Sequence, residues 1–143
     1  LSHYDFMPTV LDYLGLELPP DLNLPGSSFV PALEGKNHTG NQSVAICDEY
    51  GPTRMLREKE WKYIHRYPEG PHELYNLIED PEENHNLVGV SGYREPLIRL
   101  RADLEKWFSQ YVEVGLDGVN QPVTGRGQID TIGIDQDEQV AFV

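Results

Sequence analysis

The sequence of 143 residues has little cysteine, little positive charge and no long apolar run. Its one cysteine, Cys47, excludes a disulfide within the chain. Eleven Lys and Arg residues stand against 24 Asp and Glu, and the formal net charge of −13 disfavours binding to nucleic-acid phosphates or anionic membranes. No apolar stretch approaches the length that crosses a bilayer. We therefore expect neither nucleic acid nor a membrane as a partner.

The sequence also lacks the common patterns of catalytic and cofactor sites. Its five histidines show no metal-ligand spacing, no glycine-rich phosphate loop joins a strand to a helix, and no serine lies on a sharp strand-to-helix turn. Cys47 ends the apolar run that begins at Val44, so we interpret it as a small buried hydrophobe and not as a nucleophile. The sequence thus predicts no metal and no cofactor of its own.

Four short segments with strand patterns follow one another through tight turns. In the clearest of them, every second residue is aromatic or histidine, and the residues between them are Lys62, Ile64 and Arg66. This alternation of Trp61, Tyr63, His65 and Tyr67 is the period of a strand with two distinct faces. The turn Pro68-Glu69-Gly70-Pro71 then leads into a returning strand. Short connections make sequential strands antiparallel neighbours, so we predict a meander. Its strands are expected at about 43–49, 53–57, 61–67 and 73–77.

The stretch 93–114 predicts one long helix. Its apolar residues recur at helical spacing and form a single stripe of Leu97, Leu100, Leu104, Trp107, Phe108 and Tyr111. Burial of each such side chain contributes roughly 1.5–3 kcal/mol, so the helix must lie on an apolar face, and the meander offers one. The predicted fold class is therefore α+β, a four-stranded antiparallel meander with a long C-terminal helix packed on one face.

Capping patterns predict three further helix starts. Two short N-terminal helices are expected over 2–14 and 29–34, with Asp5 and Ser28 as N-caps. The first helix has four apolar residues on one side, Phe6, Val10, Tyr13 and Leu14. A third start is predicted at Asp80-Pro81-Glu82-Glu83, which has the composition of a capping box with proline at the first helical position.

Three segments carry patterns that belong together. The first is Asp5-x-x-Pro8-Thr9-x-Leu11, the second runs over 24–35, and the third combines W-K-Y-I, E-L-Y-N-L and D-P-x-E-x-x-N-L between Trp61 and Leu87. In this order they resemble the C-terminal subdomain of sulfatases of the alkaline phosphatase superfamily. The resemblance covers roughly residues 1–112. It implies a subdomain over 1–114, with a helical lead-in over 1–42, the sheet over 43–77 and the helix over 93–114.

The resemblance implies chemistry that this chain does not carry. Sulfatases of this kind use a formylglycine made from a Cys or Ser in a C-x-P-x-R segment, beside a calcium ion that neutralises developing sulfate charge. Here Cys47 is followed by Asp48-Glu49-Tyr50, and no serine has the required neighbours. The resemblance thus implies the C-terminal piece of such an enzyme. We expect that piece to be inactive alone and to pack on the catalytic α/β domain of its parent.

A piece that closes the substrate cleft of its parent would place polar residues on the cleft rim. Five residues near strand ends and turns are candidates: His72, Arg54, Tyr50, Glu49 and His65. Each also has a structural interpretation, because strand histidines are commonly hydrogen-bonded, Arg54 can pair with glutamates on neighbouring strands, and Glu49 fits a solvated strand end. His65 and His72 flank the hairpin turn, so their side chains can approach each other.

The tail over 115–143 is polar and rich in glycine, yet it ends in Val140-Ala141-Phe142-Val143. Such a segment cannot build a core of its own, so it is either an extended arm that docks on the main domain or on a second subunit, or a frayed acidic terminus. Oligomerisation through this tail is one expectation.

Two other functions fit the same sequence. A phosphonate or phosphate ester hydrolase of the same superfamily shares the C-terminal pattern and differs in the residues that precede it. A non-catalytic oligomerisation module would use the 115–143 tail. A C-x-P-x-R segment preceding Leu1 in the full polypeptide would favour the sulfatase over both.

Overall fold

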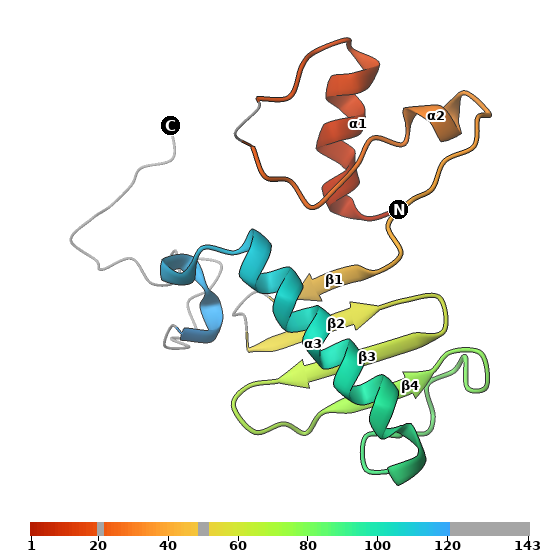
Figure 1. The fold of residues 1–143 in the computed structure, drawn as a ribbon, viewed down its shortest axis with the longest axis vertical. Coiled ribbons are helices and arrows are strands. Elements are labelled where there is room, and N and C mark those ends of the chain that lie inside the picture. The colour runs from red at the N-terminus through yellow and green to blue at the C-terminus, as the bar shows by residue number, and fades with distance from the viewer. Residues whose placement is uncertain (20–21, 49–51, 121–143) are drawn as a thin grey trace. The chain divides into compact units, whose positions relative to one another are not determined.

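The computed structural model describes residues 1–19, 22–48 and 52–120 (Figure 1). Its contacts divide the chain into two units, one of residues 1–44 with 57–59 and one of residues 45–56 with the chain from residue 60 onward. Among the described residues, no helix is both long and apolar enough to span a membrane. The tail beyond residue 120 lies outside the described residues, so its expected docking stays a prediction.

The second unit contains the predicted meander. The strands β1 (Val44–Cys47), β2 (Thr53–Arg57), β3 (Trp61–Arg66) and β4 (Glu73–Asn76) form one sheet in the order β1-β2-β3-β4 (Figure 1). β3 and β4 are antiparallel. Their register puts Tyr63 opposite Leu74 on one face and Lys62 opposite Tyr75 on the other. The alternation in the sequence therefore predicted which side chains share a face.

The long helix α3 (Arg94–Tyr111) follows a short 3₁₀ turn, η2 (Ser91–Tyr93), and lies across the sheet (Figure 1). Leu100, Leu104 and Phe108 are its buried residues, one on each successive turn. They join a core cluster with residues of all four strands, which are Ala45, Leu56, Tyr63 and Leu74. The α+β prediction is confirmed, and the core lies between α3 and the sheet.

Cys47 corrects one prediction, because it is exposed and not buried. β1 is an edge strand, and Ala45 is its buried residue. An edge strand reaches the core with only part of its length, so the apolar run from Val44 to Cys47 is only half covered.

The predicted helix start at Asp80 is also wrong, because the chain makes turns at 77–79 and 81–82 and enters no helix before Ser91. The Asp80 carboxylate accepts the backbone N–H groups of Asn84 (3.1 Å) and His85 (2.8 Å), four and five residues further on. These hydrogen bonds lower the pKa of Asp80. Glu83 has a φ of 58°, a left-handed conformation that ends helical progress. The capping composition therefore serves a turn.

The first unit holds the short helices η1 (His3–Asp5), α1 (Phe6–Tyr13) and α2 (Val30–Leu33). Asp5 is 2% exposed. Its carboxylate does not cap α1 but accepts the backbone N–H of Ser2 (2.6 Å), the backbone N–H of Ser27 (3.0 Å) and the Asn41 side-chain amide (2.9 Å). One buried charge thus ties together three segments that are far apart in sequence.

Thr9 adds a second polar connection within this unit. Its hydroxyl donates to the carbonyl of Asp5 (2.6 Å) and accepts the backbone N–H of Phe29 (3.0 Å). The expected cap, Ser28, accepts the Val30 N–H at 3.2 Å and donates to Asp12. The lead-in is therefore organised by hydrogen bonds that start from α1.

Gly26 sits where the unit has no space for a side chain. A Cβ there would lie 1.9 Å from the backbone oxygen of Tyr4, which cannot move without disturbing η1. We expect Gly26→Ala to destabilise the first unit by about 3 kcal/mol. Gly40→Ala is the control, because its Cβ would meet no atom closer than 3.6 Å. Urea unfolding measures both, and equal midpoints would contradict the prediction.

Leu104 tests the packing of α3 on the sheet. It is 1% exposed, so Leu104→Ala is expected to lower the free energy of unfolding by about 3 kcal/mol through lost burial and the cavity left behind. Ile98→Ala, on the exposed side of the same helix, should change it by less than about 0.5 kcal/mol. Similar losses for both variants, again by urea unfolding, would show that α3 does not dock as described.

Candidate functional site

The β3–β4 hairpin brings two of the candidate residues together. The rings of His65 and His72 stack with centroids 4.1 Å apart and planes 18° from parallel. The Tyr63 hydroxyl is 2.7 Å from Nδ1 of His65, and the Tyr67 ring lies 4.3 Å from the His65 ring. The expected approach of the two histidines is therefore confirmed. It arises because His65 is the second-to-last residue of β3 and His72 comes directly before β4, on the two sides of the same turn.

Burial keeps both imidazoles neutral. It lowers the pKa of His65 to about 4, with smaller contributions from His72 and the positive charge of Arg101. It also lowers the pKa of His72, again with Arg101 acting in the same direction. Burial raises the pKa of Tyr63 to about 12, so its hydroxyl stays protonated and shares a hydrogen bond with Nδ1 of His65. The cluster carries no charge at neutral pH.

The hydrogen bonds also decide where the protons are. Nδ1 of His72 accepts the backbone N–H of Arg66 at 3.3 Å. A neutral imidazole with an acceptor at Nδ1 carries its hydrogen on Nε2. His72 is half-buried, whereas His65 is 3% exposed. Of this pair, His72 is the one that can offer an N–H donor to a molecule outside the sheet.

Arg54 is 6% exposed, and its side chain makes contacts inside the fold. Its guanidinium forms an ion pair with Asp117, which lies beyond the end of α3. The structural interpretation from the sequence had named glutamates on neighbouring strands as its partners. The same group lies 3.9 Å from the ring centroid of Phe108 and 5.3 Å from that of Tyr67. Arg54 therefore holds the chain that follows α3 against the sheet. The remaining two candidates, Glu49 and Tyr50, lie outside the described residues.

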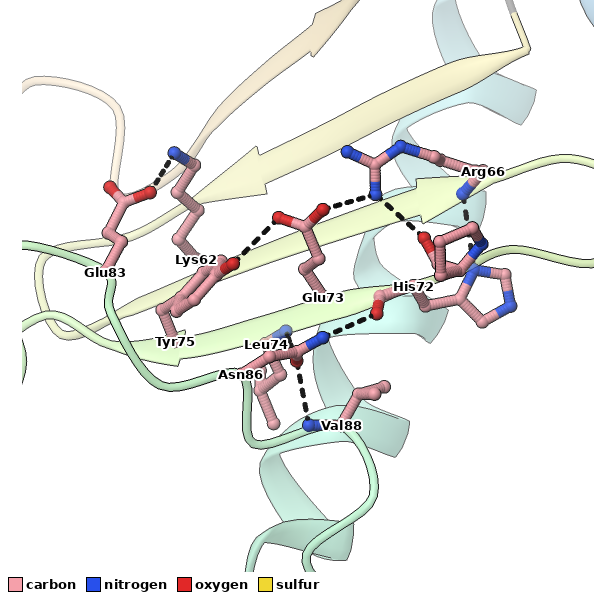
Figure 2. A network of polar contacts seen from close by, with 10 residues as sticks. Lys62, Arg66, His72, Glu73, Leu74, Tyr75, Glu83, Asn86 and Val88 are labelled. Atoms are coloured by element: carbon pink, nitrogen blue, oxygen red, sulfur yellow. Dashed lines mark hydrogen bonds and ion pairs between the residues drawn. The ribbon is translucent and has the colours of Figure 1, made fainter.

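A second polar network lies on the opposite face of the hairpin (Figure 2). Arg66 pairs with Glu73 at 2.6 Å and donates to the carbonyl of Pro71 at 2.8 Å. The Tyr75 hydroxyl donates to Glu73, and Lys62 pairs with Glu83. These charges are matched with one another, which is the behaviour of a structural network.

Asn86 is the residue that sequence reasoning missed (Figure 2). Its carbonyl oxygen accepts the backbone N–H groups of Leu74 (3.0 Å) and Val88 (3.1 Å), and its amide donates to the carbonyl of His72 (3.0 Å). An amide carries both a donor and acceptors, so it pairs with β4 as a neighbouring strand would. Asn86 thereby fixes the backbone of His72. The signal was its place before Leu87 in D-P-x-E-x-x-N-L.

In the part of the chain that the structure describes, no three His, Cys, Asp or Glu side chains gather in a way that could hold a metal ion. At the hairpin, His72 is held by the Arg66 backbone N–H, the His65 ring and the Asn86 amide.

Residues 1–110 match a family model described as N-sulphoglucosamine sulphohydrolase, C-terminal. The chain belongs to this sulfatase family. It is 29% identical over 144 residues to an ulvan-active sulfatase of Formosa agariphila, covering 75% of this chain and 28% of the relative. The chain thus spans little more than a quarter of the length of this relative.

Solved structures agree with the family. One protein, solved in complex with its substrate D-glucosamine-2-N,6-O-disulfate, has a TM-score of 0.66 and 28% identity, covering 82% of this chain and 25% of that chain. A phosphonate monoester hydrolase of Agrobacterium radiobacter has a TM-score of 0.61 and 27% identity, covering 76% and 25%. The resemblance read from the sequence motifs is confirmed, and so is the superfamily.

The His65 imidazole makes stability depend on pH. A histidine in the unfolded chain titrates near pH 6.5, whereas the pKa of His65 in the fold is about 4. Between these values the unfolded state binds a proton that the folded state does not. We therefore expect the free energy of unfolding to fall as pH decreases from 6.5 towards 4, by up to about 1.4 kcal/mol per pH unit.

Urea unfolding at about pH 7 and about pH 5 measures this slope. His65→Gln should remove the part that belongs to His65, and His85→Gln should keep it, because the His85 side chain is exposed. A His65→Gln variant with an unchanged slope would show that His65 is not held neutral.

Proposed function

We propose that this chain is the C-terminal part of a hydrolase whose preceding catalytic domain cleaves sulfate esters. In this proposal the chain packs on that domain and closes its substrate cleft. One observation carries it, the match of residues 1–110 to a sulfatase C-terminal domain with the same sheet-and-helix fold. The match covers only 28% of the ulvan-active sulfatase, so most of that relative lies outside the matched segment.

The catalytic centre is proposed to lie outside this chain. The resemblance implies a formylglycine and a calcium ion, but the residues here fit neither, because no C-x-P-x-R segment occurs and no cluster of ligands is found among the described residues. When bound in the catalytic domain, calcium would neutralise charge that develops on the sulfate. No step through either group is assigned to this chain, which we propose carries no cofactor.

His72 is the rim residue that the geometry supports best. Its position is fixed from three directions: the Arg66 N–H holds Nδ1, the His65 ring stacks against it, and Asn86 holds its carbonyl. The resulting Nε2–H donor is neutral and directed, which suits an oxygen of a sulfated sugar. Sulfated carbohydrates are the substrate class we propose, in keeping with the disulfated glucosamine bound to the solved relative.

The other candidates have different proposed parts in this arrangement. Arg54 and His65 support the hairpin from behind, since both are buried. Glu49 and Tyr50 remain proposed rim residues on the basis of their place between β1 and β2 in the sequence.

One alternative has an observation in its favour. The likeness to a phosphonate monoester hydrolase supports a parent that cleaves phosphonate or phosphate esters with the same architecture. A second alternative is a non-catalytic module that oligomerises through the tail over 115–143.

Activity of the full-length polypeptide separates these functions. We expect it to hydrolyse an aryl sulfate faster than the matching aryl phosphonate monoester, because the family match is to a sulfatase. The 143-residue chain alone should turn over neither, since it lacks the nucleophile segment. A preference for the phosphonate would establish the alternative. Turnover by the isolated chain, lost on a point change within it, would overturn the proposal.

A further inference from the structure

The helix α1 exposes its apolar side and buries part of its other side, whereas a helix that covers a core buries its apolar side. Five residues of this apolar side are exposed. The exposed fraction is 37% for Val10 and 75% for Tyr13, and those of Phe6, Met7 and Leu14 lie between these values. The other side, with Pro8 and Thr9, is buried. Thr9 is bonded to the loop that precedes α2, so the polar contacts of α1 face its own unit.

The first unit therefore has no hydrophobic core among its described residues. Its buried residues between 1 and 44 are Asp5, Pro8 and Thr9. Large apolar residues outside α1 are exposed as well: Leu1, Leu16, Leu18, Leu22 and Leu33. Exposed apolar residues that gather on one side of a helix mark an interaction site more often than single exposed residues do.

We propose that the exposed apolar side of α1, formed by Phe6, Met7, Val10, Tyr13 and Leu14, is the surface on which the catalytic domain of the same polypeptide packs. This inference rests on the proposed function. The matched relatives are about four times as long as the matched segment, so a large domain is available to cover the helix. An occupant from the same polypeptide also pays no entropy of association between separate molecules.

The charge of the chain argues against a second copy as the occupant. The five residues of the surface are uncharged, so they offer no ion pairs that would attract a second chain. Each copy has a formal net charge of −13, and two such copies repel. An apolar face without charges suits a permanent contact within one folded protein.

Thiol labelling of the full-length protein tests the proposal. Leu14→Cys and Ile98→Cys make a matched pair, because the native side chains are 61% and 58% exposed in this structure. Each variant is treated with a maleimide under native conditions, and the labelled site is identified by peptide mass. We expect Cys at position 14 to react at least about tenfold more slowly than Cys at position 98, because a covered site reacts only when it opens.

Equal labelling rates would overturn the proposal. If the position 14 thiol is protected at high protein concentration and becomes reactive when a dimer dissociates on dilution, a second copy covers the surface and the proposal is wrong. Hydroxyl-radical footprinting of the unmodified full-length protein needs no substitution. Low modification of Met7 and Tyr13 relative to the unfolded protein is expected, and full modification would refute the proposal.

These measurements use no substrate. A full-length protein that protects position 14 but prefers a phosphonate ester would refute the proposed reaction and leave the proposed surface intact. Val10→Lys combined with Leu14→Lys should lower the melting temperature of the full-length protein, whereas Ile98→Lys should not. An unchanged melting temperature in the double variant would count against the contact.

Discussion

Burial of Leu100, Leu104 and Phe108 against the sheet is the interaction on which the second unit depends. A single four-stranded sheet cannot bury its own apolar face, so another element must cover that face. Here α3 covers it. The covered face then decides which residues of β3 point inward. His65 is among them, and its stacking on His72 follows from that placement. The candidate site is thus a consequence of core packing.

Each unit is stabilised internally by a different kind of interaction. The second unit buries leucines and aromatic rings, while the described first unit buries a carboxylate and a hydroxyl, those of Asp5 and Thr9. A buried charge is costly unless its hydrogen bonds are satisfied, and Asp5 has three donors. Such a network defines a shape but supplies little hydrophobic stabilisation. This contrast explains why the lead-in presents its apolar side chains outward.

Periodicity predicted the parts of the fold that depend on burial. The alternation around Tyr63 and the leucine spacing of α3 each specify which face is apolar, and both were predicted correctly. Local composition was less informative where a distant partner decides the outcome. Asp80 and Pro81 fit a helix start, but the left-handed Glu83 turns the chain away. Arg54 forms an ion pair with Asp117, which follows α3 in the chain, and no spacing in the sequence indicates this pairing.

Most motif residues that identify the family have structural parts here. Asp5 and Thr9 organise the lead-in, while Asn86 pairs with β4 and fixes His72. A domain without a nucleophile can still contribute to catalysis by positioning hydrogen-bond donors beside a centre supplied elsewhere. Position is most accurate when a side chain is held by several independent contacts, as His72 is. In the function proposed above, its neutrality matters too, because a neutral imidazole donates a hydrogen bond to an anionic ester without adding a charge beside it.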